Sequence, residues 1–421
     1  MQRSLDRRAF LGRTGRLAGA ALLATGFSPE ARARTRSAND RIGFGLIGCG
    51  SLGRNHHLNA ILRRDDFEVL AVCDPDAKHA GQAADKVGKG VATYGDYRRL
   101  LDRKDIDAVM VVTPDHWHAL PAIDACAAGK DVYCEKPLSL TIAEGRAMAD
   151  AARRYDRVFQ TGSQQRSSHL FHHACDLVRN GAIGTLKTIK ACIGGGPTLD
   201  WEPPRRAPAH LDWDMWLGPA PYVEYAPARC HYTFRWFFAY SGGKMTDWGA
   251  HHLDIAQWAN GTSHTGPVSV EATGVFPEGG MYDTAVSFDV HYEYANGVKL
   301  HCTSDGENGV TLTGTDGEIF VSRGRIAADR PEILDTPVDS GEVRLVNSRN
   351  HWSNWVDNIR SRGRPICDVE IGHRSATVCH LGNIALQLGR RLEWDPDRER
   401  FVGDEEANRM IMRPMRLPYA L

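Results

Sequence analysis

Several residues of this chain have types and spacings that suit binding a phosphate group. The run Gly48, Cys49, Gly50, Ser51, Leu52, Gly53 has the G-x-G-x-x-G spacing that lets the backbone approach a pyrophosphate. Asp74 follows Gly53 by 21 positions and ends an apolar run, where a carboxylate can accept both ribose hydroxyls and repel a 2′-phosphate. This order predicts a site for NAD, with NADP less favoured. The alternative is a simple glycine turn and a helix-capping Asp74.

Two more polar motifs directly follow apolar runs. Thr113-Pro114-Asp115-His116-Trp117-His118 follows one, and Glu135-Lys136-Pro137 follows the next. Ligands of open α/β sheets bind at the carboxyl ends of the strands, so we expect both motifs at the cofactor. Asp115 is predicted mainly as a helix cap, and Lys136 as an ammonium directed at a substrate hydroxyl. The expected cofactor contacts here are Thr113, Pro114, His118, Glu135 and Lys136.

A third motif, Ser241 to Asp254, contains Asp247 and His251. Their spacing of four places them on one face of a predicted helix. A secondary alcohol that loses hydride must also lose a proton, and histidine is the first candidate for the base. Asp247 would orient the imidazole or bind a substrate hydroxyl, while Lys136 would stabilise the developing alkoxide. The alternative is a helix N-cap at Asp247 and a structural histidine.

The sequence predicts no metal site and no disulfide framework. His251, His252 and Asp254 could be metal ligands, but adjacent histidines point to different helix faces and no H-E-x-x-H motif is present. The ten cysteines are scattered without a C-x-x-C pair, which favours small buried side chains.

An aromatic-rich stretch, 201–249, precedes and includes part of the third motif. It either packs between domains or provides flat faces for a sugar ring. Tyr232 and Arg235 in this stretch offer hydrogen-bonding groups for a polyol and are the predicted substrate contacts, with Lys136, Asp247 and His251.

The elements that must position these residues form two patterns. From Arg41, short apolar runs alternate with helical segments, which predicts a doubly wound parallel Rossmann sheet over 41–162. From residue 163, strand-like runs dominate before the chain returns to helix, which predicts an α+β domain with a large, mostly antiparallel sheet over 163–421. The fold class is therefore α/β, with a second α+β domain.

The first 33 residues have the layout of an export signal. Six arginines but only two acids occur there, Arg7 and Arg8 are adjacent, and an apolar run from Leu17 to Phe27 precedes Ala31-Arg32-Ala33. That run is too short for a permanent membrane span. The segment resembles a twin-arginine (Tat) signal, which implies the Tat machinery as a partner and a periplasmic or exported protein. Residues 34–40 would be a linker, and a basic amphipathic helix is the alternative.

The composition is that of a globular protein. Hydrophobic residues make up 42 % and charged residues 24 % of the 421 residues. Because 51 Lys and Arg stand against 52 Asp and Glu, no basic field is available to attract nucleic acid.

Taken together, these motifs resemble the glucose-fructose oxidoreductase / inositol dehydrogenase / rhizopine catabolism (Gfo/Idh/MocA) family over essentially all of the chain after the signal. The resemblance implies that Lys136, Asp247 and His251 work on a sugar or cyclitol hydroxyl, and that copies associate through the second sheet. The family's usual triple glycine is Ser241-Gly242-Gly243 here. We expect a carbohydrate dehydrogenase.

Two alternatives stay open at this point. One is an NAD-dependent glycoside hydrolase that oxidises, eliminates and re-reduces its substrate, with Tyr232, His231 or Asp254 supplying further acid-base help. The other is a nucleotide-binding protein without turnover, which the intact Lys136, Asp247 and His251 disfavour.

Overall fold

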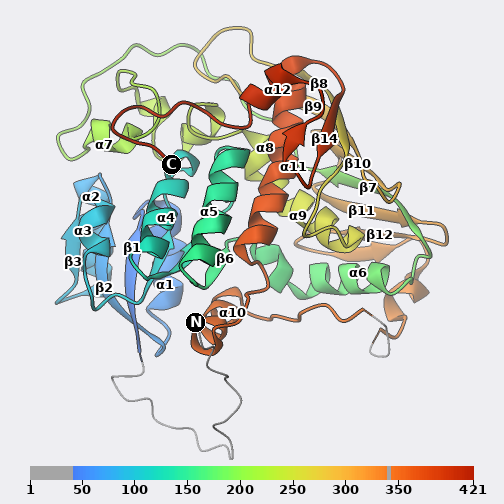
Figure 1. The fold of residues 1–421 in the computed structure, drawn as a ribbon, viewed down its shortest axis with the longest axis horizontal. Helices are drawn as coiled ribbons and strands as arrows, with labels where there is room; N and C mark the ends of the chain where they lie inside the picture. Colours follow the sequence, from blue (N-terminus) through green and yellow to red (C-terminus); the bar gives the residue numbers. More distant parts are fainter. Residues whose placement is uncertain (1–40, 339–342) are drawn as a thin grey trace, which may run out of the picture. The chain divides into compact units, whose positions relative to one another are not determined.

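Apolar runs in the first half of the chain form a six-stranded parallel sheet, seen at the left of Figure 1. The computed structural model describes residues 41–338 and 343–421, so the predicted export signal and linker lie outside the described residues. The sheet order β3-β2-β1-β4-β5-β6 is that of a Rossmann fold and confirms the prediction. The strands are β1 (Ile42–Ile47), β2 (Phe67–Cys73), β3 (Ala92–Tyr94), β4 (Ala108–Val111), β5 (Asp131–Cys134) and β6 (Phe159–Thr161).

Helices connect these strands, and capping side chains fix where several of them begin. Asp76 accepts hydrogen bonds from the backbone N–H groups of the first turn of α2, and Asp96 and Thr141 cap α3 and α5 in the same way. The helix that follows the glycine run differs from these, because it contains a π-helical segment, Gly53–His57, before α1. The helices are α1 (Leu58–Ile61), α2 (Ala77–Val87), α3 (Tyr97–Leu101), α4 (Ala119–Ala127) and α5 (Ile142–Arg154).

The second half contains a nine-stranded sheet in the order β13-β12-β11-β7-β10-β9-β8-β14-β15. Only β7 and β10 pair in parallel, so the predicted mostly antiparallel sheet is confirmed. The strands are β7 (Leu186–Cys192), β8 (Ser269–Val275), β9 (Ser287–Glu293), β10 (Lys299–Thr303), β11 (Gly309–Gly314), β12 (Glu318–Val321), β13 (Ile326–Ala328), β14 (Leu392–Asp395) and β15 (Arg400–Phe401).

One face of this sheet is apolar and is covered by helices α6 (His169–Arg179), α9 (Gly249–Asn260) and α11 (Val369–Leu388). α9 and α11 are buried on nearly all sides because each packs against the sheet and against other helices. In Figure 1, α11 lies between α5 of the Rossmann part and the second sheet, and it contacts both. This helix therefore holds the two sheets in a fixed relation.

Helix α10 (His351–Ser361) follows the second sheet in sequence but packs on the first one. Its Trp355 is fully buried in a cluster with Phe44 and Phe67, and stacks on the Phe67 ring at a centroid distance of 5.8 Å. The C-terminal part of the chain thus contributes to the Rossmann core.

The aromatic-rich stretch forms a small core of its own around α7 (Trp213–Leu217). Trp213 and Trp216 stack at 4.8 Å, and Tyr240 contacts Trp216 edge-on. Its backbone also pairs with the start of α2, since His210 accepts a hydrogen bond from the N–H of Ala77. Packing therefore accounts for most of these aromatic residues, and Tyr232 is a clear exception with 70 % exposure.

The ten cysteines are all buried free thiols, as their apolar surroundings predicted. Among the described residues, no helix combines the length and the apolar character needed to cross a membrane.

A buried ion pair in this fold leads to a stability prediction. Arg166 donates two hydrogen bonds of 2.8 Å to the carboxylate of Asp254, and both side chains are almost fully buried. Asp254→Asn should lower the free energy of unfolding by about 3–5 kcal/mol, because the arginine charge stays buried without its partner. The measurement is urea denaturation followed by circular dichroism. The control is Glu307→Gln, which breaks the exposed Arg325–Glu307 pair and should change little; equal effects of both variants would contradict the prediction.

Candidate active site

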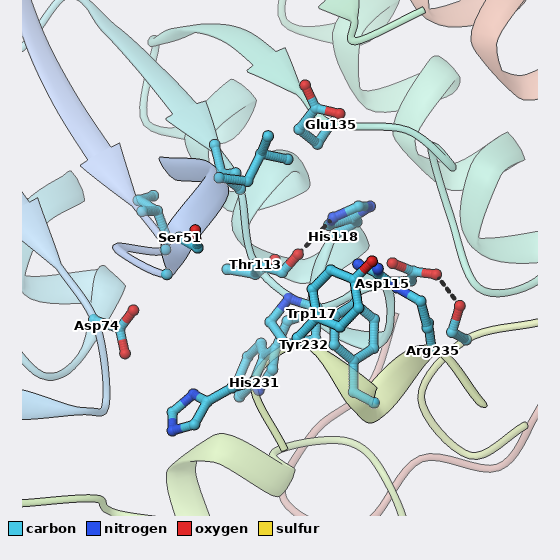
Figure 2. Close-up of a pocket in the computed structure, with 18 of the residues that line it drawn as sticks. Ser51, Asp74, Thr113, Asp115, Trp117, His118, Glu135, His231, Tyr232 and Arg235 are labelled. Carbon is cyan, nitrogen blue, oxygen red and sulfur yellow. Dashed lines mark hydrogen bonds between the residues drawn. The ribbon is translucent and has the colours of Figure 1, made fainter. Parts of the chain in front are cut away.

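A cavity of about 750 Å³ lies at the carboxyl edge of the parallel sheet. The glycine run, the two polar loops of the Rossmann part, the aromatic-rich stretch and the start of α9 all line it. In Figure 2, Ser51 and Asp74 lie at one side of the pocket and Asp115, Tyr232 and Arg235 at the other. This is the edge at which α/β sheets bind ligands.

The glycine run has the shape that a dinucleotide needs. Gly48 has a φ of +96°, and a Cβ there would lie 2.3 Å from the carbonyl oxygen of Val112. A Cβ on Gly53 would lie 2.1 Å from the carbonyl oxygen of Gly48, so this glycine allows close packing within the turn. A Cβ on Gly50 would meet no atom within 4 Å, which leaves the space through which a pyrophosphate approaches the backbone. These residues therefore fit NAD.

Ser51 and Leu52 begin the helix at this end of the pocket and both line it. Arg54, which the sequence analysis did not select, also lines the pocket and donates a 2.7 Å hydrogen bond to the carbonyl oxygen of Cys49. Its position one residue after the glycine run was the available signal, since a cation beside a pyrophosphate site is favourable.

Asp74 is buried and already engaged by the protein. Its carboxylate accepts hydrogen bonds of 2.7 and 2.8 Å from the backbone N–H groups of Cys49 and Asp76. Burial raises the pKa of Asp74 to about 7, although both N–H groups oppose that rise. The Asp74 carboxylate thus stabilises the glycine turn through the N–H of Cys49, and it also lines the pocket.

We predict that Asp74 selects NAD, because a carboxylate beside the adenosine ribose repels a 2′-phosphate. Fluorescence titration of nucleotide-free protein at a pH above 7, where the Asp74 carboxyl is ionised, should show NADP binding at least about tenfold more weakly than NAD, as expected for opposed like charges. Asp74→Ser should narrow the difference between the two affinities, whereas Lys78→Met at the start of α2 should leave NAD preferred. Tighter binding of NADP by the unmodified protein would contradict the prediction.

Thr113, Pro114 and His118 line the pocket beside the glycine run. The Thr113 hydroxyl is buried with no hydrogen-bond partner among the described residues, so it is available to a cofactor. The His118 ring lies between the carbonyl oxygens of Thr113 and Pro137, at 3.0 and 2.7 Å. Because both ring nitrogens face protein carbonyls, His118 joins the two polar loops, and its contact with the cofactor stays a prediction.

Glu135 was expected to contact the cofactor, and its carboxylate is also held by other residues of the protein. His57 lies 2.9 Å from one carboxylate oxygen, and the backbone N–H of Lys136 donates to the other at 3.1 Å. These contacts lower the pKa of the carboxyl group in spite of its burial. Glu135 borders the pocket, but its carboxylate holds the loop that carries Lys136, so it acts as a positioning residue.

The structure brings Lys136 and Asp247 together across 111 positions of sequence. The Lys136 ammonium donates hydrogen bonds of 2.9 Å to the carboxylate and to the carbonyl oxygen of Asp247. Burial opposes the charged form of Asp247, but Lys136 and Arg235 outweigh burial and lower its pKa. The pair fixes the ammonium at the pocket while leaving it partly exposed.

His251 lies at the same pocket as Lys136. Its Nδ1 atom is buried and has no hydrogen-bond partner among the described residues. Burial, and then the nearby charges of Lys136 and Arg323, lower its pKa well below the ordinary value of 6.5. The imidazole is therefore neutral at neutral pH and able to accept a proton.

The predicted single helix carrying Asp247 and His251 is wrong in one respect. Asp247 ends α8 (Lys244–Asp247), and His251 lies in α9, which begins after Trp248. Asp247 pairs with Lys136, so its carboxylate serves the ammonium and does not orient the imidazole.

Tyr232 and Arg235 line the pocket as expected of substrate contacts. The Arg235 guanidinium lies over the Tyr232 ring at 4.0 Å, which directs both side chains along one wall. His231, the neighbour considered as an alternative base, lies 3.4 Å from Asp76, and it therefore belongs to the adenosine end of the pocket.

Asp115, Trp248 and Arg323 line the pocket without having been selected as site residues. Asp115 is not a side-chain helix cap, since its carboxylate contacts the Ser241 hydroxyl instead. Its burial raises the pKa of the carboxyl group. The Arg323 guanidinium lies over the Trp248 ring at 4.6 Å. Only the tertiary fold brings Arg323, just after β12, to this site.

Models of known families match most of the described chain. The model described as "Oxidoreductase family, NAD-binding Rossmann fold" matches residues 42–163. The model described as "Oxidoreductase family, C-terminal alpha/beta domain" matches residues 192–421.

Curated relatives match over different lengths. The chain is 27 % identical to the uncharacterized oxidoreductase YrbE of Bacillus subtilis, over 82 % of this chain and 91 % of that protein. It is 25 % identical to the myo-inositol 2-dehydrogenase of Thermotoga maritima, over 86 % of this chain and 98 % of that protein. The uncharacterized oxidoreductase ORF334 of Rhizobium meliloti is 32 % identical, but this match spans 38 % of the chain and only 53 % of that protein.

Solved structures share the fold. The WlbA dehydrogenase from Bordetella pertussis, in complex with NADH and UDP-GlcNAcA, superposes with a TM-score of 0.65 at 19 % identity, covering 84 % of this chain and 99 % of that one. GenD2 from gentamicin A biosynthesis, in complex with NAD, gives 0.63 at 20 % identity, covering 88 % and 100 %.

The glycine run at the edge of a Rossmann sheet agrees with the first family model, and the second model covers more than half of the chain. The chain belongs to the Gfo/Idh/MocA oxidoreductase family and has an NAD-binding Rossmann domain.

Proposed function

We propose that this protein is an NAD-dependent dehydrogenase that oxidises a hydroxyl group of a sugar or cyclitol. The observation that carries the proposal is the presence of a neutral His251 and the Lys136 ammonium at one pocket, which also contains the glycine run. The named activity of the Thermotoga myo-inositol 2-dehydrogenase, similar along nearly all of its length, supports the substrate class.

The residues divide the chemistry between them. NAD, when bound, supplies the acceptor for the hydride that leaves the carbinol carbon. His251 accepts the proton of the hydroxyl group, and the C–O bond becomes a carbonyl. Lys136 stabilises the negative charge that develops on the oxygen, and Asp247 holds the ammonium in place. Tyr232 and Arg235 contact the remaining hydroxyls from the facing wall.

The substrate class is tested by incubating nucleotide-loaded enzyme with free sugars, cyclitols and aryl glycosides. NADH formation and released aglycone are recorded separately. A dehydrogenase forms stoichiometric NADH, or reduces a second sugar, without releasing aglycone. If no compound of the panel reacts, the proposal of a carbohydrate substrate loses its support.

The same assay separates the proposal from the redox-neutral glycoside hydrolase. That activity needs proton donation to a leaving oxygen, and neither Asp254, in its buried ion pair, nor His231, beside Asp76, is placed to provide it. Asp115 is the group that favours the hydrolase activity. Its buried carboxyl borders the pocket, and its raised pKa suits a proton donor. Multiple turnovers of aglycone release without net NADH would establish the hydrolase.

Export through the Tat machinery to the periplasm completes the proposal. It is supported by the order of arginine pair, apolar run and A-x-A site in residues 1–33. Replacing Arg7 and Arg8 together with lysine should leave precursor in the cytoplasm. Undiminished periplasmic protein after that change would contradict the assignment.

Self-association through the second sheet is also proposed. The face away from the helices is polar and shallowly hollowed, with residues such as Lys190, Glu271 and His291 exposed along it. Light scattering after gel filtration should show a dimer or a larger oligomer, whereas a monomer at micromolar concentration would rule this interface out.

A further inference from the structure

Four side chains of types that bind metal ions lie at the adenosine end of the pocket, away from Lys136 and His251. Asp76 and His79 come from the start of α2, and His210 and His231 come from the aromatic-rich stretch. This cluster could not be predicted from sequence, because more than 130 positions separate its two halves. It belongs neither to the glycine turn nor to the proposed proton transfer.

The three imidazoles converge on one carboxylate oxygen. Nε2 of His231, Nε2 of His210 and Nδ1 of His79 lie 3.4, 3.7 and 3.9 Å from Oδ2 of Asp76. The other oxygen, Oδ1, is taken by the backbone N–H groups that it caps in α2. Oδ2 is therefore the free ligand atom of a side chain that is only 1 % exposed.

These separations are too long for hydrogen bonds, which have donor–acceptor distances of about 2.7–3.2 Å. They are closer to the distances between the ligand atoms of a metal site. In a tetrahedral site with metal–ligand bonds of about 2.0–2.1 Å, the ligand atoms are about 3.3–3.4 Å apart. The ligand atoms of Asp76, His79 and His231 all lie within 4.8 Å of one another, so small side-chain rotations would bring them to one ion.

We propose that Asp76, His79 and His231 bind one divalent transition-metal ion of the zinc type, with water in the fourth position. Two imidazole nitrogens and one carboxylate oxygen suit Zn²⁺ or Co²⁺, while Ca²⁺ and Mg²⁺ require oxygen ligands. The sequence-based prediction of no metal site concerned a different group of residues, His251, His252 and Asp254.

The backbone conformation of His231 supports the proposed metal site. His231 has a φ of +56°, a left-handed conformation that few residues other than glycine adopt. In this conformation Nε2 of the imidazole lies 3.4 Å from Oδ2 of Asp76, while the neighbouring Tyr232 lines the substrate side of the pocket. Strain of this kind tends to be retained where it serves a function.

The ion would have a structural role. It would join the aromatic-rich stretch to α2 over the adenosine end of the pocket, where a main-chain hydrogen bond from Ala77 to His210 already connects the two segments. Since neither Lys136 nor His251 is a ligand, the ion takes no part in the proton transfer, and metal binding is tested without any assay of activity.

The probe is Co²⁺, added to untagged, chelator-treated protein and followed by its visible d–d absorption. We expect one equivalent to bind with the intense absorption of a tetrahedral site, and Zn²⁺ to displace it. His231→Ala and His79→Ala should each weaken Co²⁺ binding by at least about a hundredfold, since changes to groups that only orient metal ligands already cost 10–100-fold. Asp76→Asn should do the same while keeping the cap of α2, because asparagine also caps helices.

The control is His301→Ala, which removes the imidazole of a His291–His301 pair on the second sheet next to Asp289. This variant should bind Co²⁺ normally. Absence of Co²⁺ binding to the unmodified protein, or loss of binding in His301→Ala alone, would overturn the proposal. His231 is 41 % exposed, so its alanine variant should fold; unchanged binding in that variant would likewise overturn it.

Discussion

His251→Ala should lose about 10²–10⁴-fold in turnover, the effect of removing a positioned acid or base. The reason is that His251 is the neutral imidazole at the pocket, with a buried Nδ1 that no described residue occupies. NAD binding should be retained, because the glycine run and Asp74 lie at the other end of the cavity. The measurements are steady-state kinetics on the best substrate of the panel and nucleotide titration.

The adjacent histidine provides a matched control. His252 is also buried with a lowered pKa, about 4, but its Nε2 lies 3.0 Å from Asn308 and it does not line the pocket. His252→Gln should therefore keep most of the turnover. Near-normal turnover in His251→Ala would show that another group, with Tyr232 first, accepts the proton.

The Rossmann half could be predicted from the sequence because its signals are local. A buried run such as Ile42–Ile47 is continuous and apolar, and Asp76 is the type of residue that caps the N-terminus of a helix, as it does for α2. β3 was missed because its three residues, Ala92–Tyr94, are only partly buried and carry no apolar run. β15 is shorter still, with two residues that gain their structure from pairing with β14.

The site could be predicted only where one local motif contains the whole signal. The glycine run and the Lys136 loop are such motifs. Asp115 and Arg323 were not selected, because their place at the pocket depends on how distant segments pack. The contact between Asp247 and Lys136 could not be predicted for the same reason, because it joins residues 111 positions apart and differs from both roles expected of Asp247, orienting the imidazole or binding a substrate hydroxyl.

Lys136→Met should lower turnover by about 10²–10³-fold, the usual effect of removing one group that stabilises a developing oxyanion. Methionine keeps much of the side-chain volume but loses the charge. Lys136→Arg is the matched variant, since it keeps a cation that can pair with Asp247, and it should recover part of the lost turnover. Nucleotide affinity and thermal stability serve to detect a merely structural effect.

The pH profile of Lys136→Met gives the sharper test, because the charge of Lys136 also acts on His251. Burial is the larger cause of the lowered His251 pKa, and repulsion by Lys136 is the next. The base must be neutral, so kcat/KM of the unmodified enzyme should fall only as pH drops through that pKa, below 6.5. Without the ammonium the His251 pKa rises, and the acid limb should move to higher pH in Lys136→Met but not in Lys136→Arg. An acid limb that stays in place in both variants would show that the group titrating in that limb is not the His251 imidazole beside Lys136.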